Sequence, residues 1–478
     1  MNSPPSSVAP ETSGFSAQYR AWMIDAVEAL RGEDDRARTQ RDVLLAFSVR
    51  VAGAAILYLS QVVLARWMGS FEYGIYVFVW TWVLVLGGLS HGGLAMAMIR
   101  LLPEYKEKGE LDLLRGLLCG GRIAAVVMAT TVAGFGALAL WLLGPRIANP
   151  YVWPAYLALV CLPMYTLTDV QDDIGRGQRW MAVALVPPYV LRPLLVLATL
   201  FAAHEFGLPM DARTAAAAAV VATWGAAVVQ IVLVRRARVV EIPNGAEAYD
   251  FPTWFRIARP LLVIGGCDIV LQNVDVIAVS RYMSPTDVGI YYAAAKTMSL
   301  VMFVHYAVGS AVANRFSTLH ARGDQAGLQA FVRDAVNWTF WPSLAAAIVI
   351  LALGKPLLWL FGPQFLAGYP VMFVLVLGFL ARAAMGPSDF LLNMLGEQKA
   401  CAQILAATVV LDIVLNFTLV PIFGLMGAAS ATAISLTFAS VLNYIIARRR
   451  LNLDVGIWSN FGTAANAAEP ATPPVTGD

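Results

Sequence analysis

Charged residues are scarce in this sequence. Only 13% of its 478 residues are Asp, Glu, Lys or Arg, whereas 59% are apolar and the mean hydropathy is +0.67. A soluble domain carries about 25% charged residues. The composition therefore predicts an integral membrane protein and argues against a large soluble core. The formal net charge of +2 provides no global basic field, so we expect no nucleic-acid partner.

Signatures of catalysis, nucleotide binding and metal binding are lacking as well. No G-x-x-x-x-G-K-[ST], H-E-x-x-H or C-x-x-C sequence occurs. The one G-x-S-x-G match, at residues 88–92, lies inside an apolar run and not at a strand-to-helix turn. We therefore expect no enzyme, no metal and no cofactor. The cysteines are too scattered for a disulfide framework and are expected to be small apolar packing residues; they are Cys119, Cys161, Cys267 and Cys401.

Long apolar runs dominate what is present. A bilayer core takes about 20 residues per helix, and only helices satisfy their own backbone groups in lipid without closing a barrel. Alternating ten-residue strands of a barrel do not occur. The predicted fold is an all-α integral membrane fold with twelve transmembrane helices, at residues 43–65, 72–98, 117–143, 150–172, 181–203, 214–234, 260–280, 287–311, 334–353, 363–386, 400–420 and 425–447.

Basic residues orient these spans. With the N-terminus in the cytoplasm, 22 of the 33 Lys and Arg residues fall in cytoplasmic segments and five in outer loops. This bias predicts a multi-pass protein with both termini in the cytoplasm. Residues 1–42 are then a cytoplasmic extension, in which residues 15–31 are either an amphipathic surface helix or a loosely ordered tail. Residues 448–478 are expected to be a largely disordered cytoplasmic tail.

An internal repeat divides the chain in two. The segment Arg66–Tyr76, RWMGSFEYGIY, recurs as Arg281–Tyr291, RYMSPTDVGIY, with five of eleven positions identical. We interpret residues 43–234 and 260–447 as two six-helix halves joined by a cytoplasmic linker at 235–259. An even number of spans per half makes the halves parallel and pseudo-symmetric around a central cavity, an organisation found in transporters.

Cationic side chains inside the spans are candidates for binding an anionic substrate. A charge at a helix centre costs about 2.5–3.5 kcal/mol on insertion scales, so such groups persist beside water, a partner or a ligand. The prolines around Arg192 should bend its helix and present the guanidinium, which suits a phosphate. Gln61 follows Arg50 by eleven residues and shares its helix face. The predicted substrate-binding residues are Arg50, Gln61, Arg192 and Lys296.

Acidic side chains inside the spans are candidates for ion coupling. In the seventh span, Asp268, Gln272 and Asp275 are spaced i, i+4 and i+7 and should share one helix face. Together with Asp412, they suit Na⁺ or H⁺. The alternative is a structural ion pair between Lys296 and one of the span-seven aspartates. The isolated histidines His91 and His305 are expected to be packing residues, and Arg122 and Arg382 lie where their side chains can snorkel to the interface; all four stand in or beside apolar spans.

Four short segments carry a resemblance to a known family. These are Trp67–Gly69, Glu72–Tyr76, Arg100–Tyr105 and Gly396–Lys399. Over roughly residues 40–450 the chain resembles the polysaccharide transporter branch of the MOP (multidrug/oligosaccharidyl-lipid/polysaccharide) flippase superfamily. The resemblance implies a bacterial inner-membrane flippase with a charged V-shaped cavity flanked by spans 1, 2, 7 and 8. The long N-terminal extension departs from that branch and leaves room for a partner-binding role.

The function that this resemblance implies is translocation of undecaprenyl-pyrophosphate-linked oligosaccharide by alternating access, for exopolysaccharide, capsule or O-antigen synthesis. Its partners would be the lipid-linked glycan, membrane lipid, and a polymerase and other glycan-assembly proteins. Three alternatives stay open: a multidrug or small-cation antiporter of the same superfamily, an integral-membrane glycan polymerase or ligase, and a non-transport membrane scaffold. The short outer loops argue against the polymerase or ligase, which usually needs a sizeable outer catalytic loop.

Overall fold

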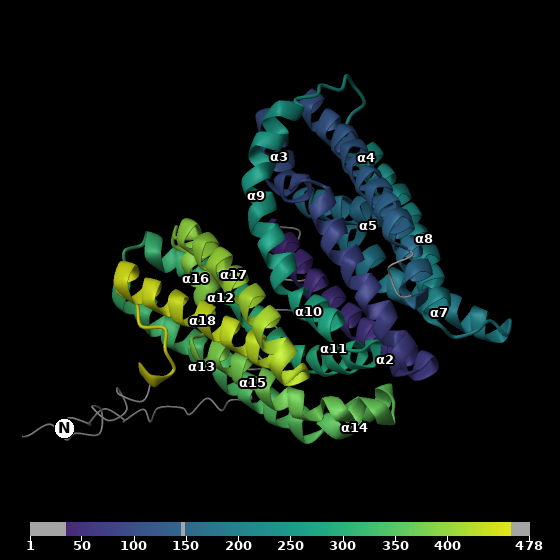
Figure 1. Cartoon of the computed structure of the whole chain (residues 1–478). Coiled ribbons are helices and arrows are strands. Elements are labelled where there is room, and N and C mark those ends of the chain that lie inside the picture. Colours follow the sequence, from purple (N-terminus) through teal and green to yellow (C-terminus); the bar gives the residue numbers. More distant parts are fainter. Residues whose placement is uncertain (1–34, 145–148, 460–478) are drawn as a thin grey trace, which may run out of the picture.

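The computed structural model describes residues 35–144 and 149–459 (Figure 1). This part of the chain is built from helices and contains no strand. Ten of its helices are long and apolar enough to cross a membrane, or up to eleven if a bent pair counts as one span. The prediction of an all-α membrane fold is confirmed. The predictions for residues 15–31 and for the end of the tail fall outside the described residues.

Helices of the first sequence half form one arm of the molecule in Figure 1, and most helices of the second half form the other. The first half contains α2 (Asp35–Ser90), α3 (Leu94–Lys108), α4 (Leu111–Leu143), α5 (Asn149–Gly177), α6 (Met181–Val186), the π-helical turn η2 (Pro187–Leu191), α7 (Arg192–Glu205) and α8 (Ala212–Glu241). The second half contains α9 (Phe251–Leu271), α10 (Val274–Tyr282), α11 (Pro285–Ser299), α12 (Met302–Ala321), α13 (Gln325–Ala352), α14 (Gly354–Phe361), the 3₁₀ turn η3 (Pro363–Gly368), α15 (Tyr369–Ala384), α16 (Ser388–Met394), α17 (Gln398–Phe423) and α18 (Leu425–Leu451).

The two arms meet at one end and diverge toward the other. At the meeting point, which we call the closed end, α2 packs against α11, α14 and η3, and an apolar core joins both sequence halves. Each arm also has an apolar cluster of its own, one around Leu102 and Trp254 and one around Phe316 and Leu391. Helix α9 lies between the arms and contacts both α3 and α17.

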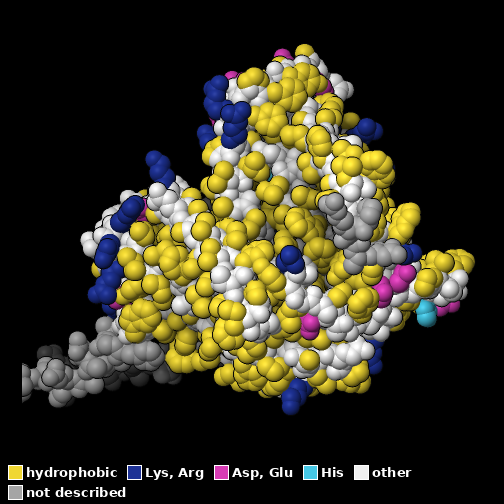
Figure 2. All heavy atoms as spheres, viewed as in Figure 1, with side chains coloured by type: hydrophobic (Ala, Val, Ile, Leu, Met, Phe, Trp, Pro, Cys, Tyr) yellow, Lys and Arg dark blue, Asp and Glu magenta, His cyan; other side chains and the backbone are white. Residues whose placement is uncertain are grey.

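Apolar side chains cover the sides of both arms, whereas Lys and Arg gather at their tips (Figure 2). We call these tips the basic end. The chain places Lys106 and Lys108 in the last turn of α3, and Arg448 to Arg450 in the last turn of α18. Large apolar side chains such as Phe135 and Trp141 are about 70% exposed, which suits contact with lipid and not with water.

Three breaks interrupt the central helices, two of them inside predicted spans. Inside α2, Gly69 leaves the helical conformation with φ 76° and ψ 169°, and it lies between the predicted spans 43–65 and 72–98. Residues 91–93 separate α2 from α3 within the predicted span 72–98. A bend of 48° separates α9 from α10 within the predicted span 260–280. The helices of the central region are therefore segmented, which gives their side chains more than one direction within a single span.

The connection between the halves is strapped to the first arm. Helices α8 and α9 extend into the predicted linker and leave residues 242–250 as its non-helical part. The buried Arg115 side chain donates to the carbonyls of Pro243 (2.8 Å) and Ala246 (3.2 Å). Hydrogen bonds from Tyr249 and then Arg238 hold the pKa of Glu247 below its ordinary value. The linker is thus an ordered strap.

Residues 452–459 follow α18 and dock onto the second arm. Leu453, Val455 and Ile457 are buried at alternate positions, the spacing of an extended segment with one inward face. Gln329 exchanges two hydrogen bonds of 2.9 Å with the backbone of Asp454. The first part of the predicted tail 448–478 is therefore docked, and disorder stays a prediction for residues 460–478.

Candidate functional site

A polar cavity of about 480 Å³ lies between α2, α3, α5, η2 and α9. Helices α2 and α5 of the first arm supply charged side chains to it, and α9 contributes the side that leads to the second arm. Its polar lining consists of Arg50, His91, Asp169, Asp173, Arg176, Tyr189, Asp268 and Gln272. The cavity thus holds carboxylates, guanidinium groups and an imidazole in one volume.

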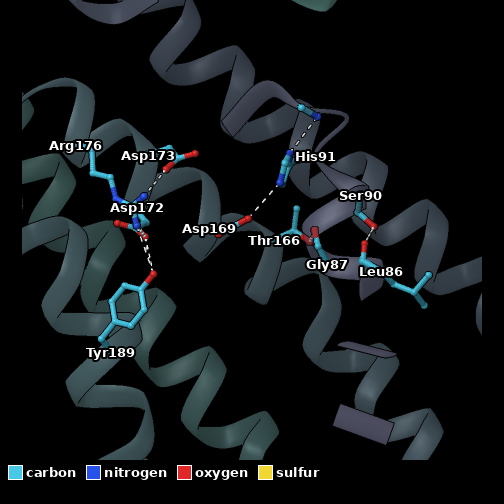
Figure 3. A network of polar contacts seen from close by, with 11 residues as sticks. Leu86, Gly87, Ser90, His91, Thr166, Asp169, Asp172, Asp173, Arg176 and Tyr189 are labelled. Atoms are coloured by element: carbon cyan, nitrogen blue, oxygen red, sulfur yellow. Dashed lines mark hydrogen bonds and ion pairs between the residues drawn. The ribbon is translucent and has the colours of Figure 1, made fainter. Parts of the chain in front are cut away.

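Helix α5 supplies a paired cluster of charges to this cavity (Figure 3). Arg176 forms an ion pair with Asp172, one turn before it, and lies 3.4 Å from Asp173. The Tyr189 hydroxyl, on η2, donates to Asp172 at 3.3 Å. Asp172 and Asp173 are both buried. Because buried charges need partners, this cluster makes α5 and η2 a unit.

His91 joins the α2–α3 break to α5. Its Nδ1 accepts a hydrogen bond from the backbone N–H of Gly93 at 3.1 Å. Its Nε2 lies 3.2 Å from Asp169 Oδ2. The imidazole is 7% exposed and the Asp169 carboxylate 41%, so the histidine is enclosed while its partner reaches the cavity water.

The second arm presents a comparable pair. His305 Nε2 lies 3.2 Å from Asp389 Oδ1, and Arg382 donates to the other carboxylate oxygen at 2.9 Å. Asp268 of the cavity interacts electrostatically with Arg382 and Asp389. Both arms therefore carry a histidine–aspartate pair, and α9 stands between them.

A separate acidic cluster lies inside the second arm. Asp275 accepts a hydrogen bond from Tyr291 at 2.8 Å, and Asp412, which is 1% exposed, accepts one from Asn416 at 3.2 Å. The two carboxylates interact electrostatically. The side-chain amide oxygen of Asn416 is buried and has no hydrogen-bond partner among the described residues. We call Asp275, Tyr291, Asp412 and Asn416 the acidic cluster; its oxygen atoms suit a hard cation or a proton.

At the closed end, the two repeated segments touch each other. A Cβ on Gly74 would overlap the Pro285 carbonyl, and one on Gly289 would lie 2.8 Å from the Ser70 carbonyl. Arg66 donates to the Trp359 carbonyl at 3.0 Å and stacks on its ring. The segments that the repeat pairs by sequence are thus paired in space, backbone against backbone.

A second, apolar crevice of about 420 Å³ also involves α2. It is lined by α2 on one side and by the α11–α12 junction on the other: Val51, Ala54, Ala55, Tyr58, Leu59, Leu300 and Phe303. Val51 follows Arg50 in the chain, so neighbouring residues of α2 line the crevice and the cavity.

Solved structures with this arrangement are known. An inward-facing multidrug resistance MATE family transporter of the MOP superfamily superposes with a TM-score of 0.70 at 12% identity, covering 89% of this chain and 100% of that one. Lipid II flippase MurJ, in an inward closed conformation, superposes with a TM-score of 0.65 at 12% identity, covering 85% and 87%. These similarities show a shared fold.

Two curated relatives are similar in sequence. A probable low-salt glycan biosynthesis flippase of Haloferax volcanii is 24% identical over 170 residues, which are 35% of this chain and only 36% of that protein. An uncharacterized membrane protein of Methanocaldococcus jannaschii is 21% identical over 405 residues, 79% and 78% of the two chains.

Family models match most of the chain. One described as polysaccharide biosynthesis protein covers residues 40–320, and the MatE model covers residues 260–418. The chain belongs to the polysaccharide biosynthesis family of MOP-superfamily flippases. The predicted resemblance is confirmed, and the relatives of this flippase are transporters and flippases, not catalysts.

The cavity of the flippase brings three predicted residues together. Arg50, Asp268 and Gln272 all line it. Arg192 lies outside this lining, with its guanidinium 5.3 Å from the Tyr165 ring centre and 5.7 Å from that of Trp80. Their roles stay predictions.

Gln61 and Lys296 also lie outside the cavity lining. Gln61 accepts a hydrogen bond from Tyr73 at 3.0 Å. Lys296 is exposed beside the Tyr292 ring and interacts electrostatically with Asp275, but no salt bridge of 4 Å or less joins it to either span-seven aspartate in the described structure. The structural ion pair is therefore absent from this conformation.

The shared face predicted for Asp268, Gln272 and Asp275 is broken. The bend between α9 and α10 leaves the first two in the cavity and turns Asp275 toward Tyr291 in the acidic cluster. A spacing of i, i+4 and i+7 gives a shared face only on a continuous helix. Residues 272–273 contain neither Pro nor Gly, so the sequence does not indicate the bend.

Several functional candidates escaped the sequence interpretation. His91 and His305 are not simple packing residues, because each has a carboxylate partner. Arg176 was counted only as a cytoplasmic charge. The signal that could have found this cluster is the spacing of Asp169, Asp172, Asp173 and Arg176, which places them within two helical turns.

Proposed function

We propose that this flippase translocates undecaprenyl-pyrophosphate-linked oligosaccharide repeat units across the bacterial inner membrane, for exopolysaccharide, capsule or O-antigen synthesis. One observation carries the proposal: α2 lines both a charged cavity, through Arg50, and an apolar crevice, through Val51. A lipid-linked pyrophosphate needs both environments, because its charged head group must lie in polar surroundings while its tail stays in hydrocarbon. A guanidinium binds phosphate bidentately, and Arg50 is exposed in the cavity.

The proposed topology has twelve spans with the basic end in the cytoplasm. The candidate span Ser48–Ser90 has 43 residues, about 65 Å of helix, roughly twice the bilayer core of about 30 Å. Splitting it at Gly69 gives two spans, and joining α9 to α10 completes twelve. The positive-inside rule then assigns the basic end, and both termini, to the cytoplasm.

The proposed cycle is alternating access. In this conformation the arms diverge toward the basic end and the repeated segments seal the opposite end. Rocking one half against the other would part the Gly74–Gly289 contact and open the cavity to the outer side. The acidic cluster is the proposed site for the driving Na⁺ or H⁺, since its two carboxylates carry more negative charge than its hydrogen bonds offset.

The test of the substrate is an arginine series. Arg50→Ala should lower glycan export about tenfold or more, since a hydrogen bond to a charged group is worth about 1.5–3 kcal/mol, and lipid-linked units should accumulate on the cytoplasmic face. Arg50→Lys should keep partial activity. Ala55→Trp should fill the crevice and block export with the charge intact. Arg213→Ala, at an exposed position outside both sites, is the control.

Export and membrane abundance are measured for each variant in cells. Normal export by Arg50→Ala at normal abundance would remove this arginine from the mechanism. Normal export by Ala55→Trp would remove the lipid crevice.

A second function, export of organic cations, is favoured by the three carboxylates that share the cavity and by the MatE match to residues 260–418. It predicts cation uptake by inverted vesicles that is lost in Asp268→Asn and kept in Arg50→Ala. If the substrate is a lipid-linked glycan, transport should instead be lost in Arg50→Ala and kept in Asp268→Asn.

A further inference from the structure

We propose that His91 is a charge sensor for the cavity: protonation of its imidazole releases the break between α2 and α3 and so favours departure from the cytoplasm-open conformation. The proposal deepens the proposed function and rests on it in two respects, namely that the substrate is an anion and that the basic end faces the cytoplasm. It begins with the hydrogen bond between the His91 ring and the Gly93 backbone.

That hydrogen bond fixes the protonation state of the ring. Since Nδ1 accepts from the Gly93 N–H at 3.1 Å, it carries no proton in this conformation. The proton of the neutral imidazole is then on Nε2, where it is donated to Asp169. In the imidazolium both nitrogens are donors. Protonated His91 therefore keeps its contact with Asp169 and loses the bond to Gly93, where two N–H groups would face each other.

The hydrogen bond between Gly93 N–H and His91 Nδ1 is one of several that shape the turn at residues 91–93. Gly92 and Gly93 have φ of 61° and 81°, in the left-handed region. The turn also holds the bonds from Gly92 N–H to Leu89 and from Leu94 N–H to His91. Both of these are backbone bonds that do not depend on pH. The His91 ring is the one titratable group among the partners that shape this turn.

The direction of α3 after the break matters to both arms. A Cβ on Gly93 would overlap the Ala258 carbonyl and lie 2.8 Å from the Leu262 nitrogen, both on α9. One turn later, Met96 of α3 packs so closely against Gly265 that a Cβ there would lie 2.9 Å from its Cε. Helix α9 in turn contacts α17 of the second arm. A change at the break is thus passed to the helix between the arms.

Charged and titratable groups from every neighbouring element face His91 across the cavity. Helix α5 contributes Asp169, Asp173 and Arg176, α2 contributes Arg50, α9 contributes Asp268 and η2 contributes Tyr189. The carboxylates favour the imidazolium and the arginines oppose it. A pyrophosphate in this cavity adds negative charge and favours the imidazolium further. Binding of the anion would then recruit a proton from cytoplasmic water, which reaches the site past the exposed Asp169 carboxylate.

His305 offers a matched comparison within the same chain. It also pairs through Nε2 with an aspartate, and it is equally buried. It lies inside α12, however, and its Nδ1 has no partner among the described residues. Protonation of His305 breaks no backbone hydrogen bond, so it should not move a helix.

The experiment measures the distance between the arms as a function of pH. Spin labels replace Arg100 on α3 and Arg448 on α18, both exposed at the basic end. In the purified full-length protein without substrate, we expect the distance distribution to change between pH 8 and pH 5.5. His91→Gln should keep the pH 8 distribution throughout, because Gln retains an acceptor and a donor without gaining charge. His305→Gln should respond like the parent. An unchanged response in His91→Gln, or a parent without any response, overturns the proposal.

Two further measurements separate this proposal from the substrate assignment. Inorganic pyrophosphate, used as the probe, should move the transition of the parent toward higher pH and leave His91→Gln unaffected. A His91-dependent pH response that pyrophosphate does not move supports the sensor and counts against the anionic substrate.

The ¹⁵N chemical shifts of the imidazoles, of which the chain has four, test the tautomer of His91 without relying on a variant. A proton on Nδ1 of His91 at pH 8 overturns the proposal.

Discussion

At the scale of single residues, Asp275 and Asp412 are two carboxylates of the second sequence half that lie outside the cavity lining. Tyr291 and Asn416 each donate one hydrogen bond to them, but neither donor carries charge. Asp412 is buried and Asp275 is partly buried. Two such carboxylates that interact with each other are stabilised when a cation or a proton joins them. The acidic cluster therefore has the composition of an ion site, with Lys296 as its electrostatic neighbour.

Replacing either aspartate by its amide tests this site. Asp275→Asn and Asp412→Asn should abolish the dependence of transport on the Na⁺ or H⁺ gradient, because they keep the shape of the side chain and remove its charge. Transport is measured in vesicles with each gradient applied separately. Asp268→Asn, in the cavity, should retain the gradient dependence. Unaltered Na⁺ and pH dependence in both cluster variants would leave these aspartates a purely structural role.

At the scale of helices, the closed end depends on two glycines that let backbones touch. Gly74 and Gly289 stand at equivalent positions of the repeated segments, and each packs against the other segment. A side chain at either position must push α2 away from α11. Overpacking of this kind costs about 1–3 kcal/mol, and the cost falls only on the conformation in which these helices touch.

Gly74→Ala should therefore shift the population toward the outward-open conformation, by about tenfold for a cost near 1.4 kcal/mol. Spin labels in place of the exposed Phe206 and Phe423, on the loops opposite the basic end, report the opening as longer distances. Gly134→Ala adds its Cβ where no atom lies within 4 Å and should leave the distances unchanged. Equal distributions in Gly74→Ala and the parent would show that this contact does not limit opening.

The sequence predicts those features of the helices that depend on local pattern. Apolar runs indicated most of the spans, and the charges within them indicated Arg50 and Asp268, which line the cavity together with Gln272. The repeat indicated two halves, but it did not predict that its segments touch. The bend after Leu271 could not be predicted, because the Gln272–Asn273 sequence resembles any polar helix surface. The pairing of His91 with Asp169 depends on two helices 78 residues apart, and no local pattern encodes their distance.

At the scale of the whole molecule, the distribution of Lys and Arg over the two arms determines how the flippase sits in the membrane. Lys and Arg gather at the tips of both arms (Figure 2), and the positive-inside rule predicts that both tips face the same side of the membrane. Cysteines replacing the exposed Leu208 and Ile422 should react with an impermeant thiol reagent added outside intact cells, and one replacing the exposed Val240 should not. The four native cysteines are first replaced by alanine or serine. Labelling at 240 with none at 208 would invert the proposed topology.

The strap that joins the halves determines how strongly each half experiences the other. A free chain of nine residues, the length of 242–250, would let its ends wander about 15–18 Å apart on average. Arg115 instead holds this chain against α4. The conformational entropy of residues 242–250 is therefore lost when the protein folds, and it is not lost again in each transport cycle. Each half then meets the other at a high and constant effective concentration. When the closed end parts, its reclosure should be rapid and independent of protein concentration, as in a unimolecular reaction.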